Sequence, residues 1–166
     1  MKINENVTFA KHAMNKKSYS WRVLTGCMLL MLSLYSQAQT APIGYVKTVT
    51  GEAWVSSAGE RVKAQPGTAI LLGSQLQTAP GASMGISFKD NTLMSFGPDT
   101  QLTVDEYLYA PAQNELKLST RLIRGTLNYI SGVIEKLSPE SVTVKTPTGI
   151  IGVRGTQFVV KVEDEQ

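Results

Sequence analysis

Met84-Gly85-Ile86-Ser87-Phe88 alternates large apolar residues with small ones, and Asp90-Asn91 follows it almost directly. A period of two is typical of a strand with one buried face, because successive side chains point to opposite faces of a sheet. Asp and Asn favour turns, since their side chains bond the local backbone and tolerate left-handed conformations. The stretch therefore predicts a strand followed by a turn.

The same two signals recur along the chain. Further alternating segments are Leu102-Thr103-Val104, Leu116-Lys117-Leu118, Leu127-Asn128-Tyr129, Val142-Thr143-Val144 and 158–162. Turn pairs between strands are Ala58-Gly59, Pro66-Gly67, Pro80-Gly81, Pro98-Asp99 and Pro139-Glu140. This spacing predicts a single compact all-β domain over residues 43–162, with a short linker at 39–42 and an acidic tail at 163–166. We expect a β-solenoid or roll; a two-sheet, jelly-roll-like β-sandwich is the alternative, because periodicity does not distinguish them.

The N-terminal 38 residues have the pattern of a targeting segment. A basic stretch ending at Arg22 precedes the apolar run Val23–Tyr35, and Ser36-Gln37-Ala38 places small residues where a signal peptidase cuts. The run is shorter than the roughly 20 apolar residues that cross a bilayer. We interpret residues 1–38 as a cleaved signal peptide, with Met14 as a candidate true start, and expect a periplasmic or secreted protein. The alternative is an N-terminal membrane anchor.

The formal charge of +3 belongs mainly to that segment. Five of the 16 basic residues and one of the 13 acidic residues precede the apolar run, so the remainder carries a net charge of −1. A chain with this balance lacks the excess of cations that neutralises phosphates. Nucleic acid is therefore not an expected partner.

Histidine and cysteine are confined to the same segment, at His12 and Cys27. The expected mature chain therefore has neither a Ser-His-Asp triad, a Cys-His pair nor a zinc site built from these residues. We expect no enzyme, no cofactor and no metal. The remaining catalytic alternative is a glycan-acting enzyme that uses carboxylates, but Asp90 and Asp99 occupy turn positions that Asp fills for local hydrogen bonding.

The segment 144–158 resembles the closing signature of FecR domains, T-P-x-x-x-x-G-V-R-G-T-x-F. The matching residues are Thr146, Pro147, Gly149, Gly152, Val153, Arg154, Gly155, Thr156 and Phe158. Upstream motifs follow in the same order at 43–46, 51–53, 73–78, 87–92 and 125–127. The resemblance covers about Ile43–Val162. It implies an extracytoplasmic recognition domain of bacterial envelope signalling.

The best-known members of the family join this domain to a membrane helix and a cytoplasmic part that acts on a sigma factor. Only about 22 residues precede the apolar run here, too few for such a folded part. Sigma-factor regulation is therefore not carried over.

The signature also has a physical interpretation. Gly149, Gly152 and Gly155 recur every third residue, which predicts tight turning or close packing against another strand. Pro147 cannot donate to a sheet ladder, so we expect it at a strand start or an edge. Arg154 is interpreted as a structural arginine that satisfies turn carbonyls in the core; the alternative is a contact with an anion on a binding face.

Three aromatic residues, Trp54, Tyr107 and Tyr109, are candidates for a ligand face, although aromatic residues in strands more often pack across strands. The leading hypothesis is a non-catalytic module that binds an envelope protein by adding a strand to a free sheet edge or filling a surface groove. The alternative is a module that binds peptidoglycan or another cell-wall glycan.

Overall fold

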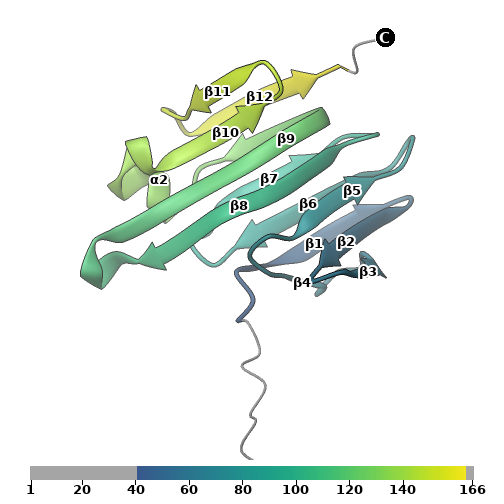
Figure 1. Cartoon of the computed structure of the whole chain (residues 1–166), viewed down its shortest axis with the longest axis horizontal. Helices are drawn as coiled ribbons and strands as arrows, with labels where there is room; N and C mark the ends of the chain where they lie inside the picture. Colours follow the sequence, from purple (N-terminus) through teal and green to yellow (C-terminus); the bar gives the residue numbers. More distant parts are fainter. Residues whose placement is uncertain (1–40, 164–166) are drawn as a thin grey trace, which may run out of the picture. The chain divides into compact units, whose positions relative to one another are not determined.

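The computed structural model describes residues 41–163, and most of this range is strand (Figure 1). The strands are β1 (Gly44–Thr50), β2 (Ala53–Ser57), β3 (Glu60–Lys63), β4 (Ala69–Ile70), β5 (Gln75–Thr78), β6 (Ser83–Phe88), β7 (Leu93–Phe96), β8 (Gln101–Ala110), β9 (Glu115–Ile130), β10 (Val142–Thr146), β11 (Gly149–Gly152) and β12 (Gln157–Val162). The helical segments are η2 (Pro111–Gln113), α2 (Val133–Leu137) and η3 (Pro139–Ser141). The interpreted signal peptide, its candidate start Met14 and tail residues 164–166 lie outside the described residues.

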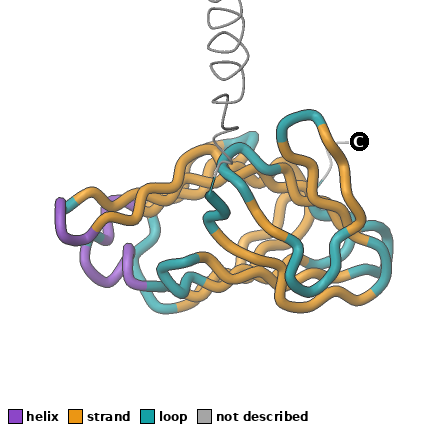
Figure 2. Tube along the Cα trace, turned by 90° about the horizontal axis from the view of Figure 1, so that it is seen from below, coloured by secondary structure: helices purple, strands orange, loops and turns teal. Residues whose placement is uncertain are grey.

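The strands form one continuous sheet in the order β3-β2-β5-β8-β9-β7-β6-β1-β4, with β10 and β12 also paired to β9 and β11 paired to β10. Among the described residues, every strand pairing is antiparallel except that of β10 with β9. The sheet curls so that its strands lie in two layers, with the helical segments at one end (Figure 2). The prediction of a single all-β domain is confirmed, and the arrangement is a roll of antiparallel strands.

Strand β9 belongs to both layers. Its first part pairs with β8 from Glu115 to Arg124, and its last part pairs with β7 from Leu127 to Ile130. The change of layer falls near Gly125, whose φ of +89° is a left-handed conformation that glycine adopts without steric cost. A Cβ at this position would lie 2.3 Å from Thr100 Oγ1 and 2.4 Å from Thr100 Cα. Only glycine therefore fits where β9 passes from one layer to the other.

The core fills the space between the layers. One layer contributes Val46, Ile86, Met94 and Tyr129, and the other contributes Val55, Leu76, Leu102 and Leu122, each at most 1% exposed. Ile86, Leu102 and Tyr129 are apolar members of the alternating segments, so the period of two there corresponds to the inward face of each layer. Burial of this face is the main force that holds the layers together.

The predicted turns are also present, at 58–59, 66–67, 80–81 and 98–99. Helix α2 was not predicted because its single turn, Val133–Leu137, is too short to show a helical period. Gly125 does not end the strand that carries it, because β9 accommodates a positive φ there and continues to Ile130.

Candidate functional site

The signature residues Thr146, Pro147 and Gly149 form the tip of the β10–β11 hairpin. Thr146 pairs with Gly149 across the hairpin, and Pro147 and Thr148 make the two-residue turn. Proline fits a turn because its ring fixes φ near the value that the first turn position needs. The Thr146 hydroxyl donates to the Gly149 carbonyl oxygen at 3.1 Å. Pro147 thus lies in the turn itself, between two strands.

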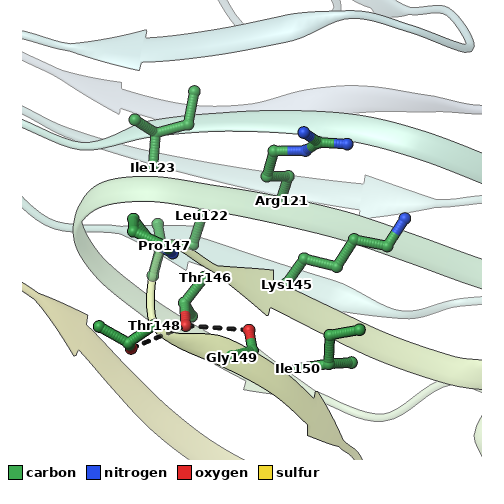
Figure 3. Close-up of a pocket in the computed structure, with 9 residues that line it drawn as sticks. All are labelled: Arg121, Leu122, Ile123, Lys145, Thr146, Pro147, Thr148, Gly149 and Ile150. Atoms are coloured by element: carbon green, nitrogen blue, oxygen red, sulfur yellow. Dashed lines mark hydrogen bonds between the residues drawn. The ribbon is translucent and has the colours of Figure 1, made fainter.

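A groove of about 480 Å³ opens beside this hairpin (Figure 3). It arises because the parallel pairing of β10 with β9 ends at Lys145 and Arg121, where the hairpin turns away, whereas β12 pairs with β9 only from Gly125. The residues that line it are Arg121, Leu122, Ile123, Lys145, Thr146, Pro147, Thr148, Gly149 and Ile150. Signature residues therefore form one wall of the groove and β9 forms the other.

Two cations and one acid set the charge at one end of the groove. Arg121 Nη2 lies 2.9 Å and Lys145 Nζ 3.1 Å from the same oxygen, Asp105 Oδ2. Burial opposes ionisation of Asp105, but the hydrogen bonds and charges of Arg121 and Lys145 outweigh it and hold the pKa of Asp105 below its usual range. One carboxylate shared by two cations leaves a net positive charge, which favours an acidic group in a ligand.

Strand β11 forms an exposed edge next to the groove. All four of its residues are exposed, with Ile150 at 70% and Ile151 at 36%. It pairs only with β10, so its other side is a free edge of the sheet within the described residues. Natural proteins blunt such edges with charge, proline or short length, and Gly149-Ile150-Ile151-Gly152 has neither charge nor proline.

The other terminal strands are better protected. Strand β3 carries Glu60, Arg61 and Lys63 among its four residues, and β4 is only two residues long. Strand β12 has Lys161 near its end. By these criteria β11 is the edge most open to pairing with another strand.

The second half of the signature, residues 153–158, connects the β10–β11 hairpin to the rest of the domain. Val153 is buried, with 2% of its surface exposed, and its N–H donates to the Val142 carbonyl. Gly155 has a φ of +142° and donates its N–H to Glu135 Oε1 at 3.1 Å. Phe158 stacks on Tyr129 at 4.9 Å between ring centroids. The turning role expected for glycine holds at Gly155.

Two details of the signature differ from the sequence interpretation. The expectation that Arg154 is a core arginine is wrong: its side chain is exposed, and the neighbouring Val153 occupies the core position. The close packing expected at Gly149 and Gly152 is also not found, because a Cβ at either position would meet nothing within 4 Å. Thr156 contributes its backbone carbonyl, which accepts the Ser131 N–H at 3.0 Å.

The three candidate ligand-face aromatics do not share a surface. Trp54 points outward from β2, with the Arg61 guanidinium carbon 4.5 Å from its ring centroid. Tyr107 instead points inward, where it stacks on Phe88 at 5.4 Å. Tyr109 also packs against the core. Strand β8 contains a bulge between Val104 and Glu106, which shifts the face on which the later residues lie.

Asp90 has a larger structural role than a turn residue. Its side chain is fully buried and accepts hydrogen bonds from the Thr92 hydroxyl at 2.6 Å and from the Thr92 and Ile134 N–H groups at 3.3 Å. The Tyr107 hydroxyl donates to Asp90 Oδ1 at 3.3 Å, and burial, with the Asp90 charge, raises the pKa of Tyr107. The carboxylate thereby joins the β6–β7 turn to α2 and β8.

Within residues 41–163, no group of three or more His, Cys, Asp or Glu residues has the geometry to hold a metal ion. No helix in this range is both long and apolar enough to cross a membrane. Asp99 lies in a turn with φ of +51°, and Glu106 pairs with Lys117 at 3.0 Å.

Arg121 and Lys145 were not singled out from the sequence. Each is a polar residue at an outward position of an alternating strand, which is ordinary for a solvated face. Their approach depends on the parallel pairing of β9 with β10, two segments more than twenty residues apart. The sequence contains no local signal for that pairing.

These features define a class of protein: a small all-β domain in which the signature residues form a hairpin with an exposed edge strand. The family model described as FecR protein matches residues 74–166, which is more than half of the chain. The chain belongs to the FecR family. This is a family of signalling and regulation that works with other envelope proteins and is not known as enzymatic. Comparisons with curated proteins and with solved structures return no match.

Proposed function

We propose that this protein is a non-catalytic recognition module of envelope signalling, exported from the cytoplasm, that binds a segment of a partner protein along the free edge of β11. The observation that carries the proposal is the exposure of all four β11 residues on an edge without charge or proline. Family membership supports the signalling role and a protein partner.

The expected mode of binding is strand addition. A partner segment laid beside β11 would pair with the backbone groups on its free side, each hydrogen bond contributing about 1 kcal/mol net. A four-residue strand offers only a few such bonds, so the backbone alone gives modest affinity. Burial of the Ile150 side chain, now 70% exposed, adds an apolar contribution.

The groove beside the hairpin supplies selectivity. In strand addition the backbone provides affinity, whereas pockets for alternate side chains decide which sequence binds. A partner segment that follows β11 can place one side chain near Arg121 and Lys145, where the net positive charge favours a carboxylate. We therefore infer a partner segment that is extended, apolar where it meets Ile150 and acidic where it enters the groove.

The test is crosslinking of the full chain in envelope extract of the native host, with mass spectrometry as the readout. The Ile150→Lys variant adds a charge to the edge, as natural edge strands do, and is expected to abolish recovery of the dominant partner. The matched control is Val159→Lys on β12, a residue of similar exposure at 64%, which is expected to retain the partner. Equal recovery with both variants would exclude β11 as the binding edge, and absence of any competable partner from wild type would exclude the function itself.

A further inference from the structure

The outward face of one layer carries a continuous polar band. Strand registers place five residues in a row across β3, β2, β5, β8 and β9: Lys63, Trp54, Gln77, Gln101 and Arg124. Residues directly opposite one another in neighbouring strands have side chains on the same face. The row therefore presents one aromatic ring, two amides and two cations to the same side.

A second row lies beside the first, two residues along β3, β2, β5 and β8 and three residues along β9, where the register shifts. It contains Arg61, Ser56, Gln75, Thr103, Arg121 and Lys145, and it reaches from β3 to β10. Six strands spaced about 4.8 Å apart give the row a length of about 24 Å. Neither row contains an acidic residue, and beyond Lys145 the second row meets the exposed Ile150 of β11.

The charge of this two-row band is positive. Three of its five cations form ion pairs with two acids: Arg121 and Lys145 with Asp105, and Lys63 with Glu52 at 3.3 Å. The Lys63–Glu52 pair is more than half exposed on both sides and therefore weak. The band is positive although the chain after the N-terminal segment has a net negative charge, so the cations are concentrated on this face.

The chemistry of the band indicates one class of ligand. We propose that it binds a carboxylate-bearing polysaccharide. The amides of Gln75, Gln77 and Gln101 are donors and acceptors suited to sugar hydroxyls, and the amide of Gln77 donates to that of Gln75 at 3.4 Å, which orders both. The Trp54 ring is partly exposed and has the Arg61 guanidinium carbon 4.5 Å from its centroid. A sugar ring would pack on the exposed part of the indole beside this cation, and the cations complement the carboxylates.

Other polymers fit less well. A protein interface usually has an apolar centre with several anchors, whereas the two rows hold Trp54 alone. Single-stranded nucleic acid is usually held by several aromatic rings on which successive bases stack. The band shares Arg121 and Lys145 with the groove beside β11, whereas Trp54, Gln77 and Gln101 lie on β2, β5 and β8, away from the proposed protein-binding edge.

The experiment measures binding of polygalacturonate to the purified full chain by isothermal titration calorimetry, with neutral dextran as the comparison polymer. We expect polygalacturonate to bind, dextran not to bind, and the affinity to fall as salt screens the cations. The Trp54→Ala variant should weaken binding about tenfold, the loss expected on removal of one stacking ring.

The matched control is Tyr45→Ala, which removes an aromatic residue that is 43% exposed on β1, in the other layer. It should bind polygalacturonate as wild type does, and circular dichroism should show both variants folded. The proposal is overturned by absence of binding, by equal loss in both variants, or by equally tight binding of poly-glutamate or single-stranded DNA, which would mark a general anion surface. Neither variant alters β11. A negative result with polygalacturonate therefore does not bear on protein binding at β11, which the crosslinking experiment tests separately.

Discussion

Replacement of Gly125, which lies within β9, by alanine should destabilise the domain more than the same change at the turn glycine Gly67. Two separable costs act at this position. The left-handed conformation, with φ of +89°, costs a residue with a Cβ about 1–2 kcal/mol. The new methyl group would also lie 2.3 Å from Thr100 Oγ1 and 2.4 Å from Thr100 Cα, and overpacking of this kind costs about 1–3 kcal/mol.

Gly67→Ala isolates the first cost. Gly67 has almost the same φ, +92°, but a Cβ there would meet nothing within 4 Å. We therefore expect Gly67→Ala to lose about 1–2 kcal/mol and Gly125→Ala to lose about 2–5 kcal/mol, a large fraction of the stability of an ordinary domain. The difference between the two variants is the cost of forcing β9 away from Thr100.

Equilibrium urea unfolding, followed by far-ultraviolet circular dichroism, measures both free energies. The slope with denaturant should stay constant, since both variants expose the same surface on unfolding. Losses of unfolding free energy that agree within about 0.5 kcal/mol for the two variants would be indistinguishable. In that case the close approach of β9 to Thr100 adds no cost, and the predicted difference between Gly125 and Gly67 is refuted.

Asp90→Ala should lower the unfolding free energy by at least about 3 kcal/mol, because it leaves several buried donors, including those of Thr92 and Ile134, without an acceptor. The same urea assay measures this loss. A loss below about 1 kcal/mol would mean that water replaces the carboxylate as the acceptor. For Asp105, the folded-state pKa is lowered, so its contribution is present above the unfolded pKa and is lost as pH falls through the folded value. The stability advantage of wild type over Asp105→Asn should therefore be constant near neutral pH and shrink below about pH 4. An advantage that is unchanged at pH 3 would show that the ion pairs of Asp105 with Arg121 and Lys145 do not produce it.

The alternating segments predicted the strands well because burial of one face is a local property of the sequence. In Met84–Phe88 the apolar residues are the buried ones, and the Asp90-Asn91 turn follows as expected. The partners of each strand were not predictable in this way. The pairing of β9 with β7, β8, β10 and β12 is set by contacts between distant segments, which a period of two does not encode.

The candidate site was predicted in part for the same reason. The signature glycines predicted tight turning, and this segment contains the β10–β11 turn. Pro147, however, lies in that turn and not at the strand start or edge expected for it. Which of two neighbours is buried depends on how the chain leaves β11, and this placed Val153 in the core and Arg154 in solvent. Trp54 and Tyr107 fell on opposite faces because a bulge in β8 changed the parity of the strand.

The shared strand β9 has a consequence for the order in which the domain can be assembled. Strands β7 and β8 both need β9 as a neighbour, so neither layer is closed until the chain has emerged as far as Ile130. Until then both strands present unpaired edges, the surfaces most prone to association with other chains. A chain that emerges with its N-terminus first should therefore remain unfolded until Ile130 has emerged, and then fold in one late, cooperative step.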